Sequence, residues 1–294
     1  MSAEKPLDKE IHKSEKRLGI IAGGGEMPLR LVDACRSRRI DPFIVAIEGQ
    51  AETELIQNHD HMVVPIGTSS KVLEAFRARN IRDIVFIGTI RRPSLSEIRP
   101  DLWTVRFFAR FGFKGLGDNS LLSSLKLALE EEGFKIRGVQ EYVDDLLAND
   151  TFCTLSPVPD HDDWADIRYG IKICRQIGAL DIGQSIVVQE GMILGLEAIE
   201  GTDKLIERCA GYRRPGRKPI LIKLSKPDQD KTLDLPTIGL KTVELCIRHG
   251  YRGIVIESGR TILLDPLVLK QKAEEKSLFI VTVNPDGIIP DESK

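Results

Sequence analysis

A charged segment from Lys223 to Gly239 holds the residues of this sequence that are best suited to chemistry. It lies between an apolar run at 219–222, which predicts a buried strand, and an amphipathic run at 240–249, which predicts a helix. Ammonium groups bind phosphate oxygens and carboxylates bind divalent cations. The segment mixes both types, as Lys223, Lys226, Asp228, Asp230, Lys231 and Asp234. The pattern predicts a phosphate ester held with a divalent cation, and a solvated, charged loop remains the alternative.

A second candidate segment, Glu-Gly-Thr-Asp at residues 200–203, follows a predicted strand at 192–197. It puts two carboxylates and a hydroxyl at the start of a predicted helix, which suits a metal-bridged phosphate or sugar hydroxyls. A capping turn, with Thr202 or Asp203 as the cap, explains the same pattern equally well. The residues leave both interpretations open.

Glycine follows three predicted strands in the first half of the chain. The first strand leads through a glycine cluster into an amphipathic helix, and backbone amides at such a helix start can form an anion site. The three strand ends are Gly23-Gly24-Gly25, Gly67-Thr68 and Gly88-Thr89. Ligands bind beyond the carboxyl ends of parallel strands, so Gly24, Gly67 and Thr68 are candidate substrate contacts. A tight structural turn is the alternative, because Pro28 stands where a dinucleotide fingerprint has its third glycine.

Strands and helices alternate along the first half of the chain, which predicts a Rossmann-like, doubly wound parallel sheet. The second half combines a helix at 164–179, a hairpin of strands at 184–189 and 192–197, and strands at 253–257, 261–264 and 279–283, so a mixed α/β domain is expected. Prolines and polar residues near 149–160 place a boundary there. The expected division is an extension at 1–17, a first domain at 18–150, a linker at 151–159, a second domain at 160–285 and a tail at 286–294.

Aromatic and basic residues are interleaved in the band from Trp103 to Phe113. Because Trp103, Phe107 and Phe111 recur at helical spacing, a core stripe or an apolar surface against lipid or a partner is favoured over nucleobase stacking. Asp118 precedes a predicted helix at 121–132. Asp118 or Asn119 is a natural N-cap of that helix, although a ligand contact is also open for Asp118.

Composition predicts an ordinary soluble globular protein. Of the 294 residues, 41% are hydrophobic and 29% charged, and the net charge of −2 provides no basic field to attract nucleic acid. No apolar run reaches the ~18 residues of a membrane span, and the charged N-terminal residues lack the apolar core of a signal peptide, so a cytoplasmic protein is expected. The five scattered cysteines predict buried free thiols, four of them in helices, and the five histidines lack metal-ligand spacing.

Several short motifs, spread over both halves of the chain, resemble those of one family. They are Gly-Gly-Gly-x-x-Pro at 23–28, Gly117-Asp118-Asn119, Val188-Gln189-Glu190-Gly191, Glu-Ala-Ile-Glu-Gly-Thr-Asp at 197–203, and Lys226-Pro227-x-Gln229-Asp230 through Asp234-Leu235-Pro236-Thr237-Ile238-Gly239. In these the chain is similar to the LpxI family, the UDP-2,3-diacylglucosamine diphosphatases of lipid A biosynthesis. The resemblance implies two α/β domains with the ligand in the interdomain cleft.

The resemblance also implies a reaction, a magnesium-dependent hydrolysis in which water attacks the α-phosphorus of UDP-2,3-diacylglucosamine to give UMP and 2,3-diacylglucosamine 1-phosphate (lipid X). Such an attack needs charge neutralisation and a positioned base. Asp234 is the implied catalytic carboxylate, and Asp203 and Asp234 are the implied ligands of Mg²⁺. The residues implied to contact substrate in the second half are Gln189, Glu200, Gly201, Thr202, Lys223 and Lys226.

Other functions and partners stay open. An NAD(P)-dependent oxidoreductase would use the first strand and its glycine turn, although Pro28 weakens that interpretation. A non-catalytic UDP-sugar-binding or regulatory module would use the same crevice without needing a carboxylate cluster. The implied substrate carries two acyl chains, so peripheral contact with the inner face of the inner membrane is expected, with the aromatic band as the candidate surface. A homo-oligomer is left open.

Overall fold

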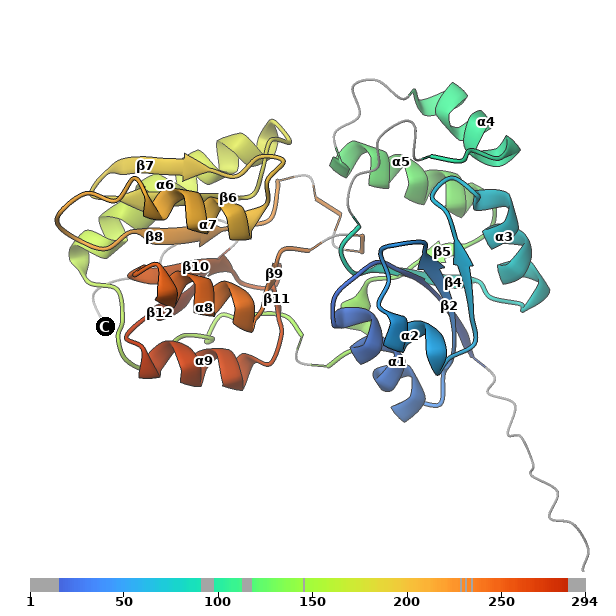
Figure 1. The fold of residues 1–294 in the computed structure, drawn as a ribbon, viewed down its shortest axis with the longest axis horizontal. Coiled ribbons are helices and arrows are strands. Elements are labelled where there is room, and N and C mark those ends of the chain that lie inside the picture. Colours follow the sequence, from blue (N-terminus) through green and yellow to red (C-terminus); the bar gives the residue numbers. More distant parts are fainter. Residues whose placement is uncertain are drawn as a thin grey trace, which may run out of the picture. The chain divides into compact units, whose positions relative to one another are not determined.

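The computed structural model describes residues 16–90, 98–112, 118–144, 146–227, 229–230, 232–233 and 235–284, except the side chains of 118–120. Of the predicted site residues, Asp234 and the side chain of Asp118 therefore lie outside the described residues. The chain divides into two compact units: the first runs up to Arg110 and includes Leu129–Tyr142, and the second comprises Phe111–Ala128 and the chain from Val143 on. Each unit has a sheet flanked by helices (Figure 1), which confirms the expectation of two α/β domains.

The first unit is built on a parallel sheet. Its strands are β1 (Arg17–Ala22), β2 (Asp41–Ile47), β3 (His61–Val64), β4 (Asp83–Ile87) and β5 (Lys135–Ile136). They lie in the order β3-β2-β1-β4-β5, the order of a doubly wound nucleotide-binding sheet, so the Rossmann-like prediction is confirmed. One strand end was predicted wrongly: β3 ends at Val64 rather than Ile66, because Pro65 has no amide proton to donate to the ladder.

Helices connect these strands and extend beyond them. They are α1 (Met27–Ser37), α2 (Thr53–Gln57), α3 (Ser69–Ala78), α4 (Leu102–Phe111) and α5 (Asp118–Glu131), with a 3₁₀ turn at Val139–Glu141. In α4, Phe107 is buried and its ring stacks on Trp103 with centroids 5.7 Å apart. The helical spacing of the aromatic band thus reflects packing at Phe107, which confirms the core-stripe interpretation there.

The second unit has a mixed sheet with helices on both faces (Figure 1). Its strands are β6 (Ser185–Gln189), β7 (Met192–Leu196), β8 (Ile220–Lys223), β10 (Gly253–Glu257) and β12 (Phe279–Val283), in the order β12-β10-β8-β6-β7. The strands β8, β10 and β12 are parallel, whereas β6 runs antiparallel to β8 and β7. The hairpin predicted at Glu190-Gly191 is confirmed.

Alternating side chains of this sheet form two cores. Val187, Leu221 and Ile254 pack with the helices α7 (Thr202–Ala210), α8 (Leu240–Arg248) and α9 (Pro266–Glu275). Their sequence neighbours on the same strands point the other way and pack with α6 (His161–Ala179). Because successive strand residues face opposite sides, strands covered on both faces read as continuous apolar runs.

Two boundaries in the second unit differ from the sequence expectation. The helix α6 begins at His161 rather than Trp164, because the Asp160 carboxylate accepts hydrogen bonds from the amides of Asp162 and Asp163 and caps a polar first turn. The charged segment ends before Gly239, because β9 (Thr237–Ile238) pairs in parallel with β11 (Ile262–Leu263). We call residues 224–236, between β8 and β9, the central loop.

The four helical cysteines, Cys35, Cys174, Cys209 and Cys246, are buried free thiols, as predicted, whereas Cys153 is free but only partly buried, which corrects the expectation for that residue. Burial raises the pKa of Cys35 and Cys209 to about 11 and that of Cys174 to about 12, and it also raises the pKa of Cys246. The thiolate is the reactive species. We therefore expect a thiol reagent to label Cys153, which is partly exposed, well before the others, as located by mass spectrometry. Rapid labelling of Cys246 in the folded protein would contradict this assignment.

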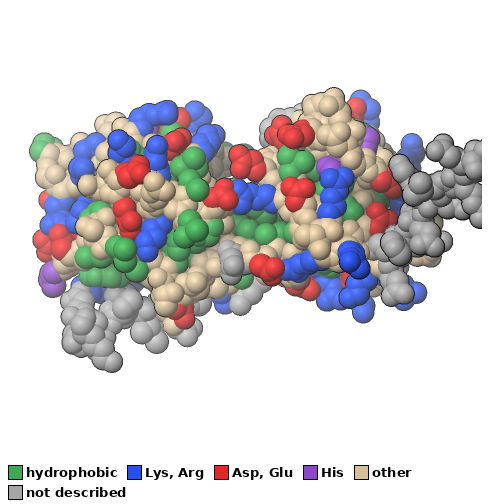
Figure 2. All heavy atoms as spheres, turned by 90° about the horizontal axis from the view of Figure 1, so that it is seen from below, with side chains coloured by type: hydrophobic (Ala, Val, Ile, Leu, Met, Phe, Trp, Pro, Cys, Tyr) green, Lys and Arg blue, Asp and Glu red, His purple; other side chains and the backbone are tan. Residues whose placement is uncertain are grey.

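Charges are mixed over the visible surface. On the face shown in Figure 2, Lys and Arg side chains are interspersed with Asp and Glu side chains, and the described part of this face has no continuous basic stripe. This agrees with the near-neutral net charge of −2. Within the described residues, every helix is too short or too polar to cross a bilayer.

Candidate functional site

The carboxyl ends of β8 and β10 gather several of the residues singled out in the sequence. Lys223 ends β8 and pairs with Ile256 of β10. Because β6 is antiparallel to β8, its first residue, Ser185, also pairs with Lys223, and Ser185 accepts a hydrogen bond from the amide of Glu197. The start of the central loop and the 197–203 segment therefore lie at one edge of the sheet, which we call the site edge. Parallel strands place ligand sites at such an edge.

Glu257, the last residue of β10, is fully buried and holds the start of the central loop. Its carboxylate accepts hydrogen bonds from the Ser225 amide, at 3.0 Å, and from the Ser225 hydroxyl. Arg175 of α6 donates to the same carboxylate at 2.5 Å and to the Ser225 carbonyl oxygen at 3.2 Å. A carboxylate is stable in the interior when it is paired and hydrogen-bonded, and Glu257 meets both conditions.

Lys223 is 8% exposed, and its ammonium group donates to the carbonyl oxygen of Thr237 at 3.0 Å. Lys223 precedes the central loop and Thr237 follows it, so this contact joins the two ends of the loop. A buried ammonium group close to a ligand edge is suited to binding a phosphate oxygen. The proposed substrate contact through Lys223 stays a prediction.

Ion pairs also hold the body of the central loop. Lys226 donates to Asp181 at 2.5 Å, and Lys126 of α5 donates to Asp230 at 2.6 Å and to Thr232 at 3.1 Å. Burial raises the pKa of the Asp230 carboxyl, but hydrogen bonds from Lys126 and Thr232 outweigh it, and the pKa lies below its ordinary value. Asp230 is thus a charged partner of Lys126, which makes it a poor proton acceptor at neutral pH.

The 197–203 segment is held by internal contacts. The alternative of a side-chain cap at Thr202 or Asp203 is wrong: Gly201 is the N-cap residue of α7, with a φ of 80° that favours glycine. Thr202 donates its hydroxyl to Glu197 at 2.8 Å, and Asp203 pairs with Lys241 at 2.7 Å. Glu200 accepts from Arg208 at 2.5 Å. Roles for these residues toward sugar or metal stay predictions.

Gln189 lies at the other end of β6, away from Lys223 in the sheet register. Its side chain is fully buried and binds the backbone of the loop before β8, donating to the carbonyl oxygens of Arg214 and Arg217 and accepting from the Arg214 amide. The structure therefore does not bring Gln189 together with the site edge. Its side chain supports the approach to β8, and substrate contact stays a prediction.

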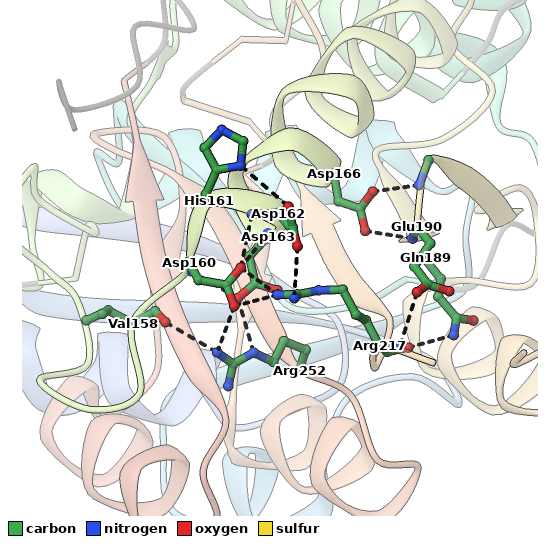
Figure 3. A network of polar contacts seen from close by, with 11 residues as sticks. Val158, Asp160, His161, Asp162, Asp163, Asp166, Gln189, Glu190, Arg217 and Arg252 are labelled. Atoms are coloured by element: carbon green, nitrogen blue, oxygen red, sulfur yellow. Dashed lines mark hydrogen bonds and ion pairs between the residues drawn. The ribbon is translucent and has the colours of Figure 1, made fainter. Parts of the chain in front are cut away.

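An acidic cluster at the start of α6 occupies the same opposite edge. Asp160, Asp162 and Asp163 all contact the guanidinium group of Arg217, and Asp163 also pairs with Arg252 (Figure 3). Arg217 and Arg252 precede β8 and β10, so these contacts fasten α6 to the amino ends of both strands. The cluster is a structural clamp on the side of the sheet away from the site edge.

The clamp predicts an acid-sensitive contribution to stability. A hydrogen bond from Arg217 lowers the pKa of Asp160 to about 2, so the ionised form is favoured in the folded state. A lowered folded-state pKa stabilises the fold above the ordinary pKa, and this contribution is lost as the pH falls toward about 2. Asp160→Asn keeps a capping side chain and removes the charge. We expect its melting temperature to lie below that of the wild type at about pH 6 and the difference to shrink by about pH 3. An unchanged difference across this range would contradict the assignment.

In the first unit, Gly23 and Gly24 allow two strand ends to approach closely. The amide and carbonyl of Gly24 both bond to Thr89, each at 2.9 Å. A Cβ atom would lie 2.4 Å from the Thr89 carbonyl oxygen at Gly23 and 2.8 Å from that of Gln50 at Gly24. Backbone packing therefore explains these glycines, which supports the structural-turn interpretation. A substrate contact through Gly24 stays a prediction.

Gly67 and Thr68 are likewise engaged within the first unit. The Gly67 carbonyl accepts from the Thr104 hydroxyl at 2.7 Å, and the Thr68 hydroxyl donates to Pro65 at 2.9 Å. At the adjacent start of α3, the Asp101 carboxylate accepts from the Ser70 amide at 2.5 Å. An internal carboxylate thus takes the helix-start position that would suit a phosphate. Contacts of Gly67 and Thr68 with substrate stay predictions.

Comparison with known proteins assigns the chain to a family. Residues 17–146 match the LpxI N-terminal domain and residues 152–281 match the LpxI C-terminal domain. The chain belongs to the LpxI family. It is 34% identical over 278 residues, covering 92% of this chain and 98% of the relative, to a protein of Caulobacter vibrioides named UDP-2,3-diacylglucosamine pyrophosphatase LpxI. A UDP-N-acetylglucosamine 4-epimerase structure from Bacillus cereus aligns over 92% of this chain and 75% of its own, with only 11% identity and a low TM-score of 0.28.

The described residues of this LpxI member offer no ready-made metal site. Among them, no group of three or more His, Cys, Asp or Glu side chains is arranged to hold an ion. Three carboxylates at the site edge pair with cations: Glu257 with Arg175, Asp181 with Lys226, and Asp230 with Lys126. At the same edge the Glu197 carboxylate accepts from the Thr202 hydroxyl and the Gln184 amide, and Asp203 pairs with Lys241, while Asp228 and Asp234 lie outside the described residues.

Sequence reasoning missed the group of Arg175, Ser225 and Glu257 at the site edge of this LpxI protein. Arg175 lies 82 residues from Glu257 in the sequence, and Ser225 lies 32 residues from it. The one local sequence signal for this group is the Glu257 carboxylate, which ends the otherwise apolar strand β10. Glutamate is rarely buried without a partner, so its place there indicates a buried cation nearby.

Proposed function

We propose that this chain hydrolyses the pyrophosphate bond of UDP-2,3-diacylglucosamine in lipid A biosynthesis, with UMP and 2,3-diacylglucosamine 1-phosphate as products. The observation that carries the proposal is the match to both LpxI domains, with near full-length similarity to a relative named for this activity. As an LpxI member the chain is a hydrolase of a diphosphate bond.

Positively charged side chains at the site edge support this chemistry. Hydrolysis of a doubly charged pyrophosphate requires positive groups near the phosphates and a positioned base for water. Lys223 donates to a neutral carbonyl oxygen in the structure, and a phosphate oxygen would be the stronger acceptor. Lys226 lies just beyond Ser225 on the same loop. In the proposal these lysines bind the phosphates, and Asp234 removes a proton from the water that attacks the α-phosphorus.

The proposal includes Mg²⁺ because the resemblance to the LpxI family implies a magnesium-dependent reaction. When bound, the ion would neutralise phosphate charge. The expected ligands are Asp203 and Asp234; of these, Asp203 would first have to leave Lys241. The proposed phosphate contacts of Lys223 and Lys226 do not depend on where the ion binds.

Release of UMP tests the proposed function. Purified protein is incubated with UDP-2,3-diacylglucosamine in detergent, and UMP is quantified by chromatography with Mg²⁺ and with EDTA. We expect UMP to accumulate with Mg²⁺ and to stop with EDTA. Equal turnover with Mg²⁺ and with EDTA would show that hydrolysis does not require Mg²⁺. Tight binding of the substrate without turnover would favour the regulatory-module alternative.

The turn after β1 gives little support to the second candidate function, an NAD(P)-dependent oxidoreductase. The amides of Gly23 and Gly24 both donate to backbone carbonyls, at 2.9 Å each, so neither is directed to a pyrophosphate. A spectral titration with reduced nicotinamide cofactor is expected to give no binding. Saturable binding would return this alternative to consideration.

Peripheral membrane contact is proposed for α4, through a different face from the one suggested by its aromatic spacing. Phe107 is buried, whereas Leu102 is 75% exposed and Val105 is 50% exposed. Replacing both exposed residues with aspartate should lower the affinity for anionic vesicles in a co-sedimentation assay by about 100-fold or more, because burying such side chains contributes about 1.5–3 kcal/mol each. Leu267→Asp, at an 84% exposed position on α9, is the matched control and should sediment as the wild type does. Equal losses in both variants would contradict the assignment to α4.

A further inference from the structure

We infer that the Glu257–Arg175 ion pair, acting through Ser225, sets the geometry of the central loop for hydrolysis, which makes Glu257 a positioning residue. The inference rests on the proposed function, because the loop geometry matters for turnover if Asp234 is the catalytic carboxylate. It adds residues that the sequence motifs did not single out.

Every polar group of Ser225 is bound. Its amide and hydroxyl donate to the Glu257 carboxylate, and its carbonyl oxygen accepts from Arg175. The residue is 3% exposed, so water does not compete for these groups. A residue held through its amide, carbonyl and side chain has one orientation, and it therefore fixes the direction in which the chain leaves the sheet.

The Glu257 carboxylate is itself held rigidly. It is fully buried at the end of β10, and the backbone amide of Glu257 donates to the Thr261 hydroxyl at 3.2 Å. Arg175 reaches it from α6, so two elements of the core fix the position of the carboxylate. Buried ion pairs are costly to desolvate, and their best-attested use is to specify one arrangement. Here that arrangement is the start of the central loop.

The opposite end of the loop is held as well, by the Lys223 contact to the Thr237 carbonyl oxygen. The ammonium group has three N–H donors, so Lys223 can keep this contact while it binds a phosphate oxygen. Asp234 lies between these two anchored ends in the sequence. A displacement of a reacting group by about 1 Å can cost about 100-fold in rate. Loosening the Ser225 anchor should therefore slow the chemical step more than it weakens substrate binding.

Ser225→Ala is the mild test, because it removes the hydroxyl contact and keeps the amide and carbonyl contacts. We expect kcat to fall about tenfold or more while KM stays within about twofold. Glu257→Gln removes the charge and should lower kcat further. Both substitutions weaken the same contact. The kcat of the double variant should therefore be close to that of Glu257→Gln, rather than lowered by the product of the two single effects.

Thr154→Val is the matched control. Thr154 is 1% exposed, and its hydroxyl donates to Pro157 and accepts from the Ile280 amide, near the amino end of β12. The variant removes a buried hydroxyl away from the site edge, so its stability should fall as that of Ser225→Ala does while kcat stays within about twofold of the wild type.

The outcomes separate the inference from the proposed function. A wild-type protein that does not hydrolyse UDP-2,3-diacylglucosamine overturns the proposed function itself. If the wild type is active, a kcat of Ser225→Ala within about twofold of it overturns the positioning role. Equal losses of kcat in Ser225→Ala and Thr154→Val also overturn it, because they would reflect a general structural effect. Should Glu257→Gln fail to fold, Ser225→Ala decides the question.

Discussion

Asp234→Asn is expected to lower kcat for hydrolysis of UDP-2,3-diacylglucosamine by about 10²–10⁴-fold, the usual contribution of a general base. Asparagine keeps the size of the side chain but cannot take a proton from water at neutral pH. Steady-state kinetics with UMP as the measured product tests the expectation, and circular dichroism checks that the variant is folded. A fall in kcat with KM nearly unchanged would place the effect in the chemical step.

The matched control for Asp234→Asn is Asp162→Asn. Asp162 lies in the same unit, at the start of α6, and its side chain is 67% exposed on the edge opposite the site edge. Its replacement should leave kcat and KM unchanged. Near-normal turnover of Asp234→Asn would show that another group activates the water, and the carboxylate role carried over from the family resemblance would then be wrong.

Asp163→Ala is expected to cause the largest loss of stability among the variants of the clamp at the start of α6. The Asp163 side chain is 2% exposed and pairs with Arg217 at 3.0 Å and with Arg252 at 3.1 Å (Figure 3). It also accepts a hydrogen bond from the Asp160 amide. Removing one partner of a buried pair typically costs about 3–5 kcal/mol, because the remaining charges stay partly buried without it. Urea-induced unfolding measures this loss.

Asp162→Ala is the comparison for this prediction, since Asp162 contacts the same Arg217 from an exposed position. An exposed ion pair contributes about 0–1 kcal/mol, so this variant should unfold close to the wild type. If Asp163→Ala and Asp162→Ala lost the same free energy of unfolding, burial of Asp163 would not be what makes the clamp strong.

The strands of the second unit could be predicted because their patterns are local. The strand at Phe279–Val283 is found where its apolar run predicts it, and the hairpin turns at Glu190-Gly191 as expected. Both rest on signals within a few neighbouring residues. The same holds for two glycine-marked strand ends of the first unit, since β1 ends directly before Gly23 and β4 directly before Gly88.

The missed features depend on contacts between distant residues. A strand as short as Thr237–Ile238 has too few residues to show a period, and it exists because β11 pairs with it. The start of α6 is polar, so its cap at Asp160 could not be found from an apolar stripe. Glu257 gains its role from Arg175 and Ser225, which the fold brings to it from α6 and the central loop.

The most direct measurement of the central claim is phosphorus NMR of the purified protein with UDP-2,3-diacylglucosamine and Mg²⁺ in ¹⁸O-labelled water. Water that attacks the α-phosphorus leaves its oxygen on UMP, so the isotope-shifted signal is predicted in UMP. Label in 2,3-diacylglucosamine 1-phosphate would keep the substrate but contradict attack at the α-phosphorus, and the absence of both products would contradict the hydrolysis itself.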